Sequence, residues 1–221
     1  MSARLRGLPL ELGAVAGPIV MTVAWLVLGF VSPGYYMWGV HVAPYSPISQ
    51  PISGLGLGPT GPFMNAAFIV SGLLLITGAF GIFQQMPELS RRSRWIATAL
   101  LGLPGVGSVI DGFFTFEQVL PHLAGFLLVL ATVAGFPVTG FLLRREPESR
   151  AFGTWLMAAG PVTLALMAIY FLTFTPTIEG IQTGVAGLTE RIAVGEIGAW
   201  YVALGWLVYR RRVPIRRLAS S

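Results

Sequence analysis

The sequence contains no cysteine and no lysine, so all 14 of its basic residues are arginines. Without cysteine the chain has no disulfide, no thiolate metal site and no thiol nucleophile. Without lysine it cannot form a Schiff base with a carbonyl substrate. Charge is also scarce, because only 10% of residues are charged, against about 25% in a typical soluble domain. Hydrophobic residues make up 54%, and this composition predicts an integral membrane protein.

Long apolar runs divide the chain. A helix needs about 20 mostly apolar residues to cross a bilayer, and the segments that qualify are residues 13–31, 63–84, 95–116, 122–143, 153–174 and 192–209. In lipid every backbone polar group needs a partner within the protein, so each run is predicted to be a helix. The predicted fold is therefore all-α, a polytopic membrane protein with six transmembrane helices in a single domain over residues 1–221.

Thirteen of the arginines lie in four patches that flank these runs. The patches are Arg4 and Arg6; Arg91, Arg92 and Arg94; Arg144, Arg145 and Arg150; and Arg210, Arg211, Arg212, Arg216 and Arg217. The positive-inside rule places all four on the cytoplasmic side, so both termini are predicted to be cytoplasmic. Because the arginines flank apolar runs instead of forming one basic face, no nucleic-acid partner is predicted.

The connection at residues 32–62 is predicted to lie on the outer side of the membrane. It is long for a loop and rich in aromatic residues, proline, glycine and serine, which favours ordered turns over a regular helix. Two interpretations stay open. The segment is either an aromatic anchor in the headgroup layer or a lid over a pocket at the mouth of the bundle.

Ionisable residues gather near the same side. Asp111 and Glu196 are each expected about five residues inside a span, roughly 7 Å below the outer boundary. Such groups are costly in lipid and usually face a partner in the bundle interior. Arg191, the one arginine outside the patches, has Asp111, Glu196, Glu190 and His122 as candidate partners. Arg191 then either locks spans three and six together by salt bridges, or binds a lipid phosphate or other anion in an outward-facing cavity.

Several chemistries can be weighed from these residues. The candidate catalytic residues are Asp111, Glu117, His122 and Glu196, and the candidate ligand-binding residues are Arg191, Glu190, Ser53 and His122. One well-placed histidine supplies too few ligands for a zinc site, so no metal is predicted. The sequence has neither a P-loop nor a dinucleotide fingerprint, so no cofactor is predicted. No catalytic motif is complete, and whether the protein is an enzyme stays open.

A series of short motifs follows in a characteristic order. They are Tyr45-Ser46-Pro47, Ile52-Ser53-Gly54-Leu55-Gly56, Gly112-Phe113-Phe114-Thr115, Pro121-His122 and Gly187-Leu188-Thr189-Glu190-Arg191-Ile192, followed by Trp200. Together they resemble the six-helix membrane family of bacteria and archaea catalogued as domain of unknown function 998. The resemblance covers nearly the whole chain and carries no activity. It implies the six-helix fold and a site at the outer face around Ser53, Glu117, His122 and Arg191.

The sequence leaves three functional hypotheses for a multi-pass protein of a prokaryotic plasma membrane. The first is a protein that handles a lipid or small amphiphile, as a hydrolase or transferase, with membrane lipids as its partners. The second is a non-catalytic accessory subunit of a larger membrane-protein complex, since no catalytic set is complete. The third is a transporter. The inner halves of the spans lack ionisable groups, which argues against this hypothesis.

Overall fold

The computed structural model describes residues 9–219, with side chains described as far as Arg211. It is a bundle of helices: α1 (Gly13–Val31), α2 (Gly61–Gln84), α3 (Arg91–Phe113), α4 (Val119–Val129), α5 (Thr132–Leu143), α6 (Arg150–Thr173) and α7 (Ala186–Ala219). Within the described residues, six helical segments are long and apolar enough to cross a membrane, with α4 and α5 forming one of them. The predicted six-helix, all-α fold is confirmed.

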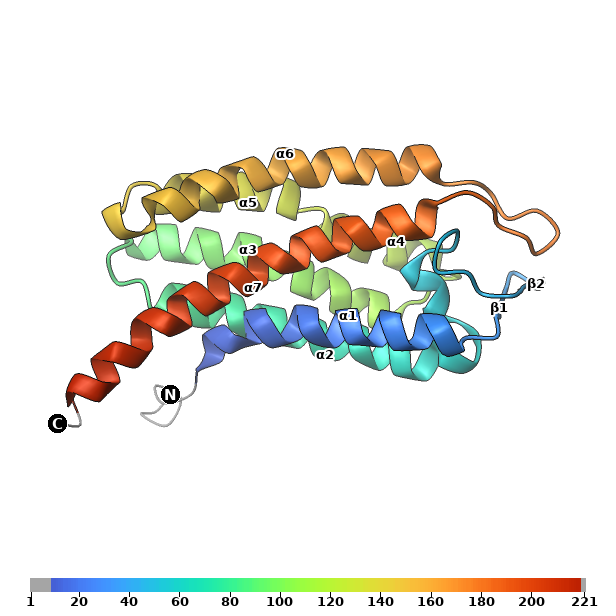
Figure 1. Ribbon diagram of the computed structural model, residues 1–221, viewed down its shortest axis with the longest axis horizontal. Helices are drawn as coiled ribbons and strands as arrows, with labels where there is room; N and C mark the ends of the chain where they lie inside the picture. The colour runs from blue at the N-terminus through green and yellow to red at the C-terminus, as the bar shows by residue number, and fades with distance from the viewer. Residues whose placement is uncertain (1–8, 220–221) are drawn as a thin grey trace.

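The two ends of the bundle differ (Figure 1). The first described residues and the end of α7 lie at one end, which we call the arginine end because α3 and α6 begin there with Arg91 and Arg150. At the opposite end, the hairpin end, lie the short antiparallel strands β1 (Tyr35–Met37) and β2 (Val40–Val42). Arg4 and Arg6, and the side chains of Arg212, Arg216 and Arg217, lie outside the described part. That the arginine end is cytoplasmic stays a prediction.

The fourth span is interrupted near its middle, where a continuous helix was expected. Between α4 and α5 the amide of Ala131 donates to the carbonyl of Leu128 (3.2 Å), and that of Val133 donates to Leu130 (3.0 Å). These bonds reach three residues back instead of four, which tightens the turn as in a 3-10 helix. Pro137, one turn later, has no amide hydrogen to donate to the carbonyl four residues before it. The span therefore consists of two half-helices that pack against different neighbours.

The half of the bundle nearer the arginine end, the arginine half, is filled by side chains. Its core contains large residues that are at most 1% exposed: Phe83, Leu101, Phe136, Leu156 and Tyr201. Tyr201 also donates its hydroxyl to the carbonyl of Leu101 at 2.8 Å. Close packing of this kind fills the interior of this half as far as the described side chains show.

A compact cap covers the hairpin end. After the two strands the chain forms short 3-10 turns at Ile52–Gly56 and Gly58–Thr60, and it buries Tyr35 and Tyr45 in a small apolar cluster. Burial raises the pKa of Tyr35 to about 12 and also raises that of Tyr45, so both hydroxyls are neutral at ordinary pH. The segment thus has the ordered turns expected from its composition, together with a hairpin that the sequence analysis did not predict.

Candidate functional site

A cavity of about 430 Å³ lies in the half of the bundle nearer the hairpin end, the hairpin half. It is lined mostly by apolar side chains from α1, α2, α3, α4, α6 and α7. On α7 the lining runs from Glu190 to Tyr201, which is roughly 16 Å along the helix. Its volume lies within the range of about 300–1,000 Å³ typical of small-molecule sites. The cavity is therefore large and long enough for an extended apolar group.

One end of this cavity is polar. Its lining there includes Asp111 near the end of α3, His122 in the first turn of α4, Glu190 near the start of α7, and Ser53 in the 3-10 turn at Ile52–Gly56. All four were candidate site residues from the sequence, and the structure brings them to one place. We call these four residues the polar end of the cavity.

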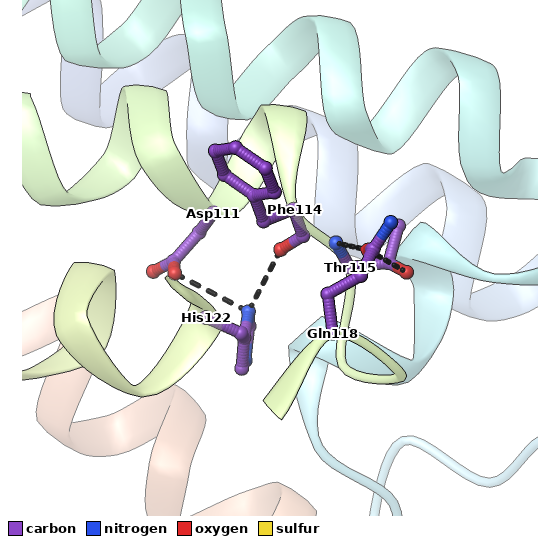
Figure 2. Close-up of polar contacts among 5 residues, drawn as sticks. All are labelled: Asp111, Phe114, Thr115, Gln118 and His122. Carbon is purple, nitrogen blue, oxygen red and sulfur yellow. Dashed lines mark hydrogen bonds and ion pairs between the residues drawn. The ribbon is translucent and has the colours of Figure 1, made fainter. Parts of the chain in front are cut away.

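Asp111 and His122 form a buried pair (Figure 2). The Nδ1 atom of His122 lies 3.2 Å from Oδ1 of Asp111 and also 3.2 Å from the carbonyl oxygen of Phe114. Because a carbonyl only accepts hydrogen bonds, Nδ1 carries the hydrogen and Nε2 is left as the acceptor. With Nδ1 bonded to the carbonyl of Phe114 and close to Asp111, Nε2 is able to take a proton from a bound group.

Two local features hold this pair in place. Oδ1 of Asp111 packs directly against Gly125 of α4, where a Cβ atom would collide with the carboxylate. In the turn between the helices, Thr115 donates its amide (2.7 Å) and hydroxyl (3.0 Å) to the side-chain oxygen of Gln118, as Figure 2 shows. The close approach of α3 and α4 thus depends on a glycine that the sequence analysis did not single out.

Glu190 and Ser53 complete the polar end. Oε2 of Glu190 accepts the amide hydrogen of Ile52 at 2.5 Å, which ties α7 to the cap. Ser53 follows directly in the chain, and its hydroxyl makes no hydrogen bond to the protein within residues 9–219. That hydroxyl is therefore available to a molecule in the cavity.

Arg191 has a different role from either one expected. Its Nη1 donates to the carbonyls of Pro47 (2.9 Å), Gln50 (3.0 Å) and Gly187 (2.8 Å), and its Nη2 donates to the hydroxyl of Tyr45 (2.5 Å). The side chain is 6% exposed and does not line the cavity. The guanidinium group therefore fastens the cap to α7.

The predicted ion pairs of Arg191 are wrong for this structure. In the described part of the chain it pairs with none of Asp111, Glu190, Glu196 and His122. The reason is geometric. The Nη donors of Arg191 are taken up by the carbonyl oxygens of Pro47, Gln50 and Gly187 and by the hydroxyl of Tyr45. Spans three and six are not joined through this arginine.

Two other candidate acids also lie outside the cavity lining. Glu196 accepts the hydroxyl of Thr163 on α6 (2.8 Å) and the indole N–H of Trp200 (2.6 Å). Glu117 accepts the backbone amide of Trp38 at 2.9 Å, in the turn of the hairpin. Both carboxylates hold elements together, and neither joins Asp111 and His122.

The hairpin turn supplies lining residues that the sequence analysis missed. Trp38 (φ 48°) and Gly39 (φ 80°) both have left-handed backbones, as the tightest hairpin turns require. Such a conformation is strained for tryptophan, and the bond from its amide to Glu117 stabilises it. The ring of Trp38 lies 6.1 Å from that of Phe116, and both line the cavity. Tryptophan is not a residue that favours such a turn, so only Gly39 offered a signal in the sequence.

No group of three or more histidine, aspartate and glutamate side chains is placed to hold a metal ion, as far as the described chain goes. What the polar end offers is hydrogen bonding, two carboxyl groups and an imidazole that can take up a proton. These groups sit at one end of an apolar space.

Six helices able to cross a membrane, packed around an internal cavity, define a multi-pass membrane protein. The chain belongs to the family described as protein of unknown function (DUF998), whose family model matches residues 14–207. The suspected family is thus confirmed, and the match extends from α1 into α7. The chain matches no curated protein and no solved structure.

Proposed function

We propose that this protein binds an amphiphile, with the apolar chain in the cavity and the headgroup at the polar end. The observation that carries the proposal is the division of the cavity itself, which is apolar along its length and polar at one end. An amphiphile has the same division. The pair of Asp111 and His122 gives the bound headgroup an acid–base partner.

The outer wall of the cavity supports access from the lipid. Val119 and Leu123 on α4 and Phe171 on α6 line the cavity, yet they are 53%, 47% and 56% exposed on the outside of the bundle. A side chain that belongs to both surfaces lies at an opening. Because α4 packs mainly on α3 while α6 packs on α5 and α7, the proposed opening lies between α4 and α6, beside the contact between the rings of Phe126 and Phe171 (5.9 Å). A molecule dissolved in the bilayer can reach the cavity there without crossing water.

The filled arginine half favours binding over transport. Among the described residues the core below the cavity is packed with side chains such as Phe136 and Leu156, which argues against a continuous path along the bundle. The proposed setting is the plasma membrane of a prokaryote, with the arginine end cytoplasmic and membrane lipids as partners. The distribution of arginines supports this orientation. A membrane-protein complex has no specific observation in its favour.

The test is to fill the cavity. Val194 on α7 lines it, and Val194→Trp would occupy the space of the chain. Val23→Trp is the matched control, because Val23 lies on the outside of α1 and is 54% exposed. After purification in nanodiscs of native lipid, mass spectrometry of the intact complex counts bound amphiphiles. We expect wild type and Val23→Trp to carry a bound amphiphile, and Val194→Trp to lose it about tenfold. Equal occupancy in all three proteins, or none in wild type, contradicts the proposal.

A further inference from the structure

The polar end carries two carboxyl groups and no permanent cation. Among the described lining residues the acidic side chains are Asp111 and Glu190, and no arginine is among them. The nearest arginine along the chain is Arg191, whose donors point to three carbonyls of the backbone and to a tyrosine hydroxyl. Both of its Nη atoms are therefore occupied within the protein, and the side chain does not line the cavity.

Aromatic rings stand beside these carboxylates. The ring of Phe116 lies 5.4 Å from that of His122, edge to face, and 6.1 Å from that of Trp38. Glu117, bound to the amide of Trp38, adds another carboxylate at the hairpin end. Aromatic faces attract cations, most strongly where the cation is shielded from water, and carboxylates add direct charge attraction.

We infer that the headgroup held at the polar end is an ammonium group, either a protonated amine or a quaternary amine, on a single-chain amphiphile. The inference rests on the proposed function, which places the alkyl chain of the amphiphile in the cavity. A phosphate, sulfate or carboxylate headgroup would instead face Asp111 and Glu190 without a cation to pair with, and burying a charge unpaired is costly. The anion-binding role expected of Arg191 is thereby replaced by cation binding at its neighbours.

Space supports a single chain. The cavity is about 430 Å³ in volume and roughly 16 Å long beside α7. A headgroup alone would leave most of this length empty. The chain should therefore contribute much of the affinity, and a small free ammonium ion should bind weakly.

The experiment compares headgroups on one chain. Dodecyltrimethylammonium, dodecyl phosphate and dodecanol are equilibrated with nanodiscs that contain the protein, and binding to empty nanodiscs of the same lipid is subtracted. Tetramethylammonium is the probe without a chain. We expect the ammonium amphiphile to bind at least about tenfold more tightly than the other three ligands. Val194→Trp should abolish this excess binding.

Substitutions of the carboxyl groups then test whether Asp111 and Glu190 bind the ammonium headgroup. Asp111→Asn and Glu190→Gln should each weaken dodecyltrimethylammonium about tenfold and leave dodecanol unchanged, while Glu196→Gln, a carboxylate outside the cavity, should change neither. Should the first two variants fail to fold, the ranking of headgroups on wild type decides. Equal binding of the three dodecyl ligands, or tightest binding of the phosphate, overturns the inference and leaves the proposed function standing. No binding above empty nanodiscs overturns both.

Discussion

The arginine half and the hairpin half are built from the same helices, yet one is filled and the other is hollow. In the arginine half α5 lies against α6 with backbone in contact, since a Cβ atom at Gly140 would be 2.5 Å from the carbonyl of Gly153. In the hairpin half α4 lies against α3, with Gly107 packed on Gly125. The turn at Leu130 and Ala131 is where the span changes partner. The two half-helices thus make different contacts, and the cavity borders α4 and α6, where the rings of Phe126 and Phe171 lie 5.9 Å apart.

The two halves also differ in how they use polar groups. Tyr201, at the boundary between the two halves, donates its hydroxyl to the backbone carbonyl of Leu101, as expected of a buried polar group. In the hairpin half the hydroxyl of Ser53 faces the cavity without a protein partner within the described chain. Unused polar groups beside an apolar space are what a bound molecule requires.

The largest expected effect is a difference in lost stability between substitutions in the two halves. Phe136→Ala on α5 should cost about 3 kcal/mol, the low end for a buried Phe→Ala change, because the site is closely packed. Phe126→Ala on α4 should cost clearly less, because Phe126 already borders the cavity. Both residues belong to the same span, so each is the control for the other. Thermal unfolding in one detergent measures the difference, and equal losses would show that the hairpin half is filled too.

A second comparison concerns the arginines. Arg191→Gln should cost about 2 kcal/mol, because it leaves buried carbonyls without their donors, and should speed hydrogen exchange in residues 46–50. Arg94→Gln, in a patch at the arginine end, should change neither. Hydrogen exchange followed by mass spectrometry reads both at once. Unchanged exchange in residues 46–50 of the Arg191 variant would mean that the cap does not depend on it.

The smallest effect concerns the hairpin. Glu117→Gln should lower stability by less than about 1 kcal/mol, since the carboxylate is exposed, yet it should loosen the turn at Trp38 and Gly39. Glu88→Gln, an exposed carboxylate in the turn between α2 and α3 at the arginine end, is the control. A nitroxide label on the hairpin, placed at Val40→Cys in this cysteine-free chain, reports the change as faster motion. Identical spectra for both variants would show that Glu117 does not restrain the hairpin.

Much of this fold could be predicted from the sequence, for physical reasons that apply residue by residue. Apolar runs in lipid must be helices, so the spans followed from composition. Asp111 and His122 lie at adjacent ends of consecutive spans, so their meeting was also within reach. The turn at Leu130 and Ala131 was not, because neither residue is a helix breaker and membrane helices tolerate a proline such as Pro137 without a break.

Arg191 shows the other limit. Its sequence neighbourhood is rich in acids, and charge pairing was the obvious expectation. The carbonyls of Pro47 and Gln50 compete for its donors only once the cap has folded against α7, and they lie more than 140 positions away in the chain. Contacts of backbone oxygens across that separation leave no mark on composition or periodicity.

Photolabelling tests most directly whether an alkyl chain binds inside the cavity. A dodecyltrimethylammonium probe with a diazirine at the end of its chain is irradiated with the protein in nanodiscs, and the labelled residues are mapped by mass spectrometry. We expect labels at the deep end of the cavity, on Pro104, Ile197 and Tyr201, and their loss in Val194→Trp. Labels confined to lipid-facing residues such as Val23 and Phe30, and unchanged in Val194→Trp, would contradict a chain bound inside the hairpin half.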